Sequence, residues 1–134
     1  MYEYLNLTKG RIQDAFQSTL KEIEKSVVYM YDDAYGKVTT ANADLGTAII
    51  DKILTEEERN ELHTLSIELD HISSQLSDIA DIFDPDLCSD INTLKDADDI
   101  AFEYQHAIKT YTTFCEMRDI FYTKLNKAKE RNHA

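Results

Sequence analysis

The sequence predicts an all-α protein, an elongated bundle of four to five helices with long antiparallel helices and coiled-coil-like seams. Apolar residues recur at spacings of three and four along most of the chain, which is the period of one face of an α-helix. The 134 residues include only three glycines, one proline and no tryptophan, so few residues interrupt a helix. We expect residues 1–134 to form a single helical-bundle domain, because a chain of this length suits one hydrophobic core.

The first predicted helix covers residues 8–35. Seven apolar residues repeat there at helical spacing: Ile12, Phe16, Leu20, Ile23, Val27, Met30 and Ala34. Gly36 follows at the position where a left-handed C-cap glycine ends many helices. Loop and N-cap residues in "KVTTANAD" then predict a second helix at residues 41–54, in which Gly46 either weakens the helix or permits close packing.

The third predicted helix has the clearest start, since "TEEE" at residues 55–58 is a capping box. The Thr55 hydroxyl can accept a hydrogen bond from the Glu58 amide, while the Glu58 side chain reaches back to Thr55. The apolar residues that follow alternate steps of three and four, as in a coiled coil: Leu62, Leu65, Leu69, Ile72, Leu76, Ile79 and Phe83. Few charges flank this seam, which favours an antiparallel bundle within one chain over a zipper between chains.

Two further helices are expected near the C-terminus. Asp84 and Pro85 are the predicted N-cap and first residue of a short helix at 85–95. Either this helix continues or Asp96 caps a last long helix that ends at about residue 130. The apolar stripe of that last helix is Ile100, Tyr104, Ile108, Tyr111, Cys115, Tyr122 and Leu125.

Acidic residues concentrate in the middle third of the chain. The whole chain has a net charge of −12, and residues 55–99 alone hold fourteen acids against two bases, also a net charge of −12. Residues 1–54 carry a net charge of −2, and residues 100–134 carry +2. A surface of this sign repels phosphate, so we expect no direct binding to nucleic acid and instead a protein partner with a basic surface.

The charge pattern leads to our main functional expectation, an inhibitor or regulator that blocks a basic, nucleic-acid-binding surface. DNA-mimicking phage or mobile-element inhibitors, anti-defence proteins and acidic immunity proteins offer an analogy in charge and size only. Carboxylates three to eight residues apart on a rigid helix lie about 5 to 12 Å apart, similar to phosphates along one strand. The alternative is that the acids serve only solubility. The candidate partner-binding acids are Glu57, Glu61, Asp70, Asp78, Asp81, Asp84, Asp86 and Asp90.

Two Glu-x-x-His pairs resemble the ligand pairs of di-iron carboxylate bundles, Glu68 with His71 and Glu103 with His106. The resemblance implies a metal-binding enzyme. At about 100° per residue, however, both histidines point away from the apolar seams, whereas such ligands project into the core. We therefore expect no metal or other cofactor, and keep the four residues as an alternative metal set.

A second enzyme-like pattern is "RNELH", in which Arg59 and His63 are similar to the Arg–His pairing of helical HEPN ribonucleases, with a shorter gap than that family has. As first-turn surface residues beside a capping box, both have a simple structural explanation, so we expect no enzyme. A HEPN-like activity remains the alternative.

Cysteine usage and apolar runs bear on location and assembly. Cys88 and Cys115 have no nearby Cys or His at zinc spacing, which indicates reduced thiols in a cytoplasmic protein. The start of the chain has no export-signal pattern, and no apolar run is long enough to span a membrane. Another alternative function is a structural or assembly protein that pairs through its helical seams, as a homodimer.

Overall fold

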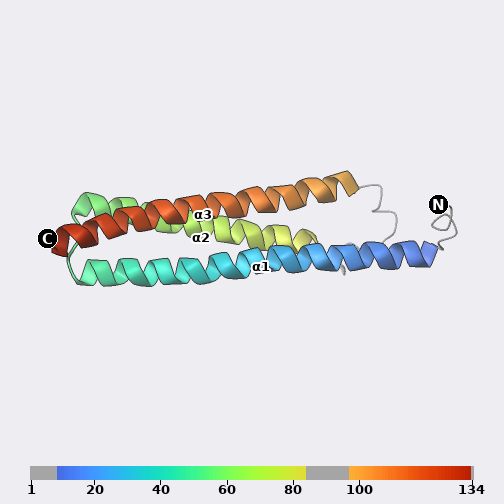
Figure 1. The fold of residues 1–134 in the computed structure, drawn as a ribbon, viewed down its shortest axis with the longest axis horizontal. Coiled ribbons are helices and arrows are strands. Elements are labelled where there is room, and N and C mark those ends of the chain that lie inside the picture. The colour runs from blue at the N-terminus through green and yellow to red at the C-terminus, as the bar shows by residue number, and fades with distance from the viewer. Residues whose placement is uncertain (1–8, 84–96, 134) are drawn as a thin grey trace.

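The computed structural model describes residues 9–83 and 97–133, with side chains for 18–83 and 100–132. Within these ranges the chain forms three α-helices and no strand: α1 (Lys9–Ile50), α2 (Glu56–Ile82) and α3 (Ala97–His133). The three lie side by side in an elongated bundle, in which α2 runs antiparallel to α1 and α3 (Figure 1). The all-α class is confirmed. The predicted count of four to five helices is wrong for the described residues.

Helix α1 continues through the predicted break at Gly36. It is one helix of 42 residues, and neither Gly36 nor Gly46 has a positive φ. The Thr39 and Thr40 hydroxyls donate to the carbonyls one turn earlier, at 3.1 Å each, as helical threonines do. The separate helices predicted at 8–35 and 41–54 are therefore a single element.

Packing explains why α1 does not end at Gly36. The buried stripe of α1 runs on beyond the glycine without a change of period: Leu20, Val27, Ala34, Val38, Ala41, Leu45 and Ala48. A helical glycine costs only about 1 kcal/mol relative to alanine, whereas each buried aliphatic side chain contributes about 1.5 to 3 kcal/mol. Burial against the other helices therefore outweighs the local signal for a C-cap.

The chain actually turns at Lys52, the one non-glycine residue with a positive φ (56°) in the described part. The Ile53 amide donates to the carbonyl of Ala48 at 3.2 Å, and the Lys52 amide donates to that of Ile49 at 3.1 Å. These two bonds form a Schellman motif, which satisfies carbonyls at the end of a helix. A lysine occupies the left-handed position that is usually a glycine, so the sequence gives no obvious sign of the turn.

Helix α2 begins as predicted. The Glu58 amide donates to Thr55 Oγ1 at 3.1 Å, and the Thr55 amide donates to Glu58 Oε1 at 2.9 Å, so both bonds of the capping box are present. Six of the seven seam residues are buried, and Leu65 is half-buried. Ser66, Ser73 and Ala80 are buried beside the seam, and the Ser66 hydroxyl donates to Asn42 of α1. The seam therefore serves intramolecular packing.

Helix α3 begins next to the predicted cap and ends at His133, slightly later than predicted. The short helix predicted at 85–95, with Asp84, Pro85 and the alternative cap Asp96, lies outside the described residues. The buried residues of α3 in the described part are Ala107, Thr110, Phe114, Phe121, Leu125 and Ala128. Ile108, which the sequence placed in the apolar stripe, is exposed. None of the described helices has the length and hydropathy of a membrane span.

Candidate partner-binding surface

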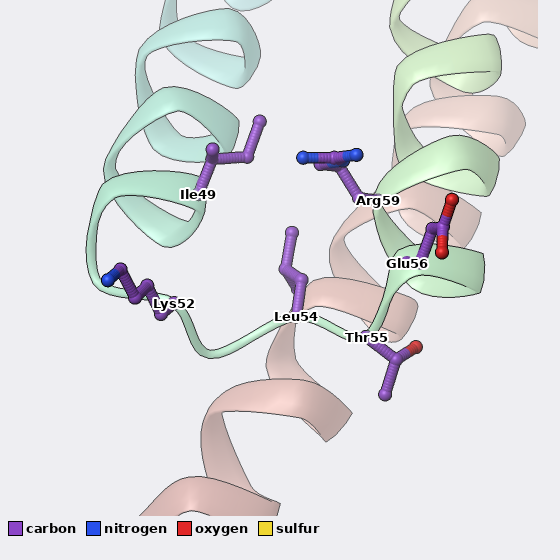
Figure 2. Close-up of a pocket in the computed structure, with 6 residues that line it drawn as sticks. All are labelled: Ile49, Lys52, Leu54, Thr55, Glu56 and Arg59. Carbon is purple, nitrogen blue, oxygen red and sulfur yellow. The ribbon is translucent and has the colours of Figure 1, made fainter.

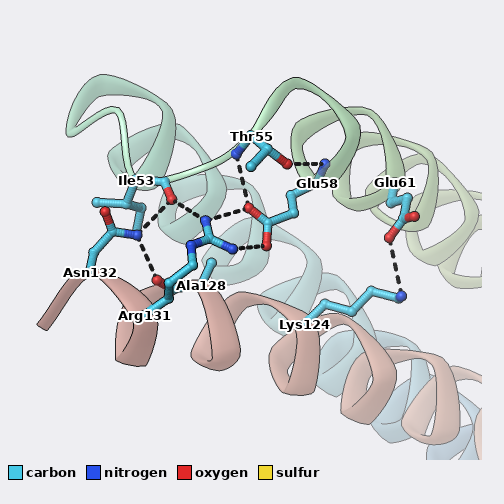
Figure 3. Close-up of polar contacts among 8 residues, drawn as sticks. All are labelled: Ile53, Thr55, Glu58, Glu61, Lys124, Ala128, Arg131 and Asn132. Carbon is cyan, nitrogen blue, oxygen red and sulfur yellow. Dashed lines mark hydrogen bonds and ion pairs between the residues drawn. The ribbon is translucent and has the colours of Figure 1, made fainter. Parts of the chain in front are cut away.

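The acidic start of α2 lies beside the basic end of α3 (Figure 3). Arg131 Nη1 and Nη2 donate to the two carboxylate oxygens of Glu58, each at 2.7 Å. Lys124 Nζ donates to Glu61 Oε2 at 3.1 Å. Glu61 was predicted to contact a partner, but it is paired within the chain. At this end of the bundle Glu58 and Glu61 are thus neutralised by bases of α3.

Two side chains of α3 also hold the α1–α2 turn at this end (Figure 3). Arg131 Nη2 and Asn132 Nδ2 both donate to the carbonyl of Ile53, at 3.0 and 2.8 Å. Arg131 hydrogen bonds, together with the Thr55 backbone amide, lower the pKa of Glu58 to about 2. A carboxylate with this pKa is fully charged at neutral pH, which favours its pairing with Arg131.

The remaining predicted acids of α2 are exposed. Glu57, Asp70, Asp78 and Asp81 make no ion pair with any described residue. Asp78 and Asp81 are one helical turn apart, but Glu57 lies about 32 Å from Asp78 at 1.5 Å per residue. The three other predicted acids, Asp84, Asp86 and Asp90, lie outside the described residues. The structure therefore brings together Asp78 and Asp81 and leaves Glu57 at the opposite end.

A groove lies beside Asp78, between the second half of α2 and the first half of α3. It is a hollow of about 340 Å³, which we call the acidic groove, lined by Gln75, Asp78, Ile79, Ile82, Phe102, Glu103 and His106. Ile79 is buried, whereas Ile82 is 43% exposed and Phe102 is 68% exposed. A hollow of about 250 Å³, to which Ile72, Lys109, Thr110 and Thr113 contribute, shares Gln75 and His106 with it. The groove thus combines carboxylates with exposed large apolar side chains.

The two Glu-x-x-His pairs do not form a common centre. His106 Nδ1 lies 3.7 Å from Glu103 Oε2, and His71 Nε2 lies 3.4 Å from Gln75 Nε2. Both histidines are exposed, as their helical positions predicted. Among the described residues, no group of three or more His, Cys, Asp or Glu side chains could hold a metal ion. The set Glu68, His71, Glu103 and His106 is not gathered for shared coordination.

Arg59 and His63, the HEPN-like pair, are both exposed on the first turns of α2. Arg59 lines a hollow of about 380 Å³ at the α1–α2 turn, with Ile49, Lys52, Leu54, Thr55 and Glu56 (Figure 2). Figure 2 shows the Arg59 side chain facing Ile49 and Leu54 across this hollow. His63 does not line it. The pair therefore does not face one shared hollow in the described structure.

Sequence reasoning missed a row of polar contacts between α1 and α3. Three tyrosine hydroxyls of α3 bond to side chains of α1, and each pair is separated by 78 residues. The pairs are Tyr104 with Ser26 (2.9 Å), Tyr111 with Asp33, and Tyr122 with Asp44 (2.6 Å). Because α1 and α3 are parallel and rise by the same distance per residue, residues at the same level of the two helices stay the same number of positions apart in the sequence. The available signal was that the polar residues Ser26, Asp33 and Asp44 each directly precede a buried residue of α1, namely Val27, Ala34 and Leu45.

These contacts shift the ionisation of the groups involved. Burial and the hydrogen bond to Asp44 raise the pKa of Tyr122 to about 12. The hydrogen bond to Asp33 and burial raise the pKa of Tyr111 above its ordinary value. Burial alone raises the pKa of Asp33, but hydrogen bonds from Tyr111 and Lys37 outweigh it, so the net shift is downward. Both tyrosines therefore remain neutral donors, and the row is structural.

The comparisons with known proteins find no counterpart of this chain. No protein-family model, curated protein or solved structure matches it. A function for the protein must therefore be argued from the charges, the exposed side chains and the grooves described above.

Proposed function

We propose that this protein is an acidic helical module that binds and blocks a basic, nucleic-acid-binding surface of a partner protein. The observation that carries the proposal is the unpaired state of Asp70, Asp78 and Asp81 among the described residues, on a helix whose Glu58 and Glu61 are paired with bases of α3. Carboxylates without an internal counter-ion destabilise a fold by mutual repulsion. A basic partner removes that repulsion, which supplies a reason for their presence.

The distribution of charge along the bundle supports the same proposal. No lysine or arginine occurs in the sequence from Asn60 to Leu94. The basic residues Lys124 and Arg131 compensate only the start of α2. The other end of α2 lies near the start of α3, where Asp98 and Asp99 occupy the first turn (Figure 1). The second half of α2 thus carries acids and no lysine or arginine, which favours fast, salt-sensitive association with a basic surface.

The proposal is tested by capture and competition. The protein is immobilised, partners are captured from its native cells and identified by mass spectrometry, and the purified partner is tested for displacement of labelled DNA or RNA. We expect displacement to weaken steeply with salt and to be lost in the triple variant Asp70→Asn, Asp78→Asn, Asp81→Asn. The matched variant Glu57→Gln, which removes a charge at the other end, should displace nucleic acid normally. Normal displacement by the triple variant would contradict the proposal.

Self-association is a second candidate, which exposed apolar residues on α1 favour. The exposed fraction is 69% for Tyr29, 58% for Tyr35 and 38% for Val28. Val28 and Tyr35 are seven residues apart, so they share one face. Sedimentation equilibrium should show a dimer that Tyr35→Ser dissociates. A monomer over the whole micromolar to millimolar range would exclude this candidate.

A further inference from the structure

We propose that the acidic groove binds a basic amphipathic α-helix of the partner, which lies against α2 and α3 as a fourth helix. The inference rests on the proposed function, since it names the element of the basic partner that this surface recognises. It differs from that proposal in requiring apolar anchoring as well as charge.

The apolar side chains of the groove are the first argument. Ile82 and Phe102 come from different helices and flank the same hollow, where Ile79 is buried. A phenylalanine that is 68% exposed leaves most of its apolar surface in water. Partially exposed aromatic side chains beside a hollow are the kind of anchor around which protein interfaces are built. The groove therefore offers apolar contacts that a purely electrostatic surface lacks.

The charges of the groove select the occupant. Asp78 and Glu103 line the hollow from α2 and α3, and Asp81 is one turn from Asp78. Among the described residues, Lys109 is the one lysine or arginine that lines either hollow, and it lines the smaller one. Lysine or arginine residues on both sides of an apolar stripe complement this arrangement, whereas an acidic or neutral segment does not.

The length and direction of the groove fit a helix. The acidic groove continues into the smaller hollow, with which it shares Gln75 and His106. Together the two hollows extend along α2 from Ile72 to Ile82, a distance of about 15 Å at 1.5 Å per residue. That distance accommodates anchors at positions i, i+3 or i+4, and i+7 of a bound helix. A helix laid between two antiparallel helices also completes the geometry of a four-helix bundle.

A designed peptide tests the inference. The probe is a fluorescein-labelled peptide with leucines on one helical face and lysines on both sides of it, and the control is a scrambled peptide of the same composition. Fluorescence anisotropy should show binding of the amphipathic peptide and much weaker binding of the scrambled one. Phe102→Ser should weaken binding by about tenfold or more, the effect expected of an anchor residue. Ile120→Ser, which changes an exposed isoleucine of α3 outside the groove, should leave it unchanged.

Charge and location are measured separately. The double variant Asp78→Asn, Glu103→Gln should weaken peptide binding at low salt and lose that difference at high salt, because screening removes the electrostatic part. Backbone amide shifts caused by the peptide should lie on α2 from Ile72 to Ile82 and on α3 from Phe102 to Thr113. Shifts confined to other faces would overturn the inference.

The outcomes distinguish this inference from the proposed function. Equal binding of the amphipathic and scrambled peptides, or normal binding by Phe102→Ser, would overturn the helix-binding groove while leaving capture of a basic partner intact. If the peptide binds as expected but nucleic-acid displacement survives in the triple aspartate variant, the proposed function fails and the groove remains. Competition between the peptide and dimer formation would assign the groove to a second copy of the chain, against this inference.

Discussion

Glu58 and Arg131 join the first turn of α2 to the last turns of α3 through two hydrogen bonds of 2.7 Å each. The same carboxylate accepts the Thr55 amide at 2.9 Å, so one side chain completes both a helix cap and an ion pair. This double use connects local structure to packing: the cap fixes the Glu58 side chain, and the fixed side chain orients the end of α3 (Figure 3).

Replacing Glu58 by glutamine isolates the ion pair from the cap, because glutamine is also suited to the third position of a capping box. We expect Glu58→Gln to lower the free energy of unfolding by about 1 kcal/mol at neutral pH. This value is at the upper end of the range for an exposed ion pair, because the contact is bidentate. Urea denaturation followed by circular dichroism measures this. The control Glu57→Gln, on the same turn but unpaired among the described residues, should change stability by much less. Equal effects would show that only net charge matters.

The stabilisation by Glu58 should depend on pH in a defined window. Its pKa is lowered from an ordinary 4.5 to about 2 in the folded protein. A lowered carboxylate pKa gives stability that is complete above pH 4.5 and is lost as the pH falls towards 2. The stability difference between the wild-type protein and Glu58→Gln should therefore be constant near neutral pH and shrink towards pH 2. A difference that stays constant down to that pH would contradict the assigned pKa.

The part of the fold that sequence predicts well is the part that local signals control. The Thr55 cap and the seam from Leu62 to Phe83 depend on residues within a few turns of one another, and both are present. The break predicted at Gly36 fails, because the preference of one residue is smaller than the burial of the apolar residues on either side.

In the candidate site, too, the sequence predicts the features that depend on one helix and does not predict those that depend on two. Exposure of Asp70, Asp78 and Asp81 follows from helical periodicity, so the sequence predicts it correctly. Pairing of Glu61 with Lys124, 63 residues away, depends on which helices are neighbours and in which register they pack. The acidic groove needs the same information, because Ile82 and Phe102 lie on different helices. Helical periodicity alone does not give that register.

The continuity of α1 makes a prediction for Gly36. A Cβ atom added at Gly36 meets no other atom within 4 Å, and the residue has no positive φ. Gly36→Ala should therefore raise the free energy of unfolding by about 0.5 to 1 kcal/mol, the ordinary gain for alanine in an exposed helix. Thermal denaturation measures the change. A loss of stability would instead indicate a left-handed glycine and a helix that ends at this residue.

At the turn, replacing Lys52 by glycine should be favourable, whereas at Gly36 the favourable change replaces glycine by alanine. Its φ of 56° is a conformation that costs an L-residue about 1 to 2 kcal/mol and glycine nearly nothing. Part of that gain is offset by the greater freedom of glycine in the unfolded chain. We expect Lys52→Gly to raise the free energy of unfolding by about 0.5 kcal/mol, measured by urea denaturation. The neighbouring change Asp51→Gly, at a residue without a positive φ, should lower it.

The contact between Tyr122 and Asp44 should control stability at alkaline pH. Burial and this hydrogen bond raise the pKa of Tyr122 from 10.0 to about 12. A raised pKa gives stability that is complete below pH 10.0 and is lost as the pH rises towards 12.

A spectrophotometric titration of tyrosinate should accordingly show a late component. Tyr122→Phe should reduce that component. Asp44→Asn should lower the pKa of Tyr122 only in part, because burial, the larger cause, remains. If Asp44→Asn left the late component unchanged, the hydrogen bond between α1 and α3 would have no role in the shift. If Asp44→Asn instead returned Tyr122 fully to its ordinary pKa, burial would have no role in the shift. That result would contradict the close packing of α1 and α3 at this level.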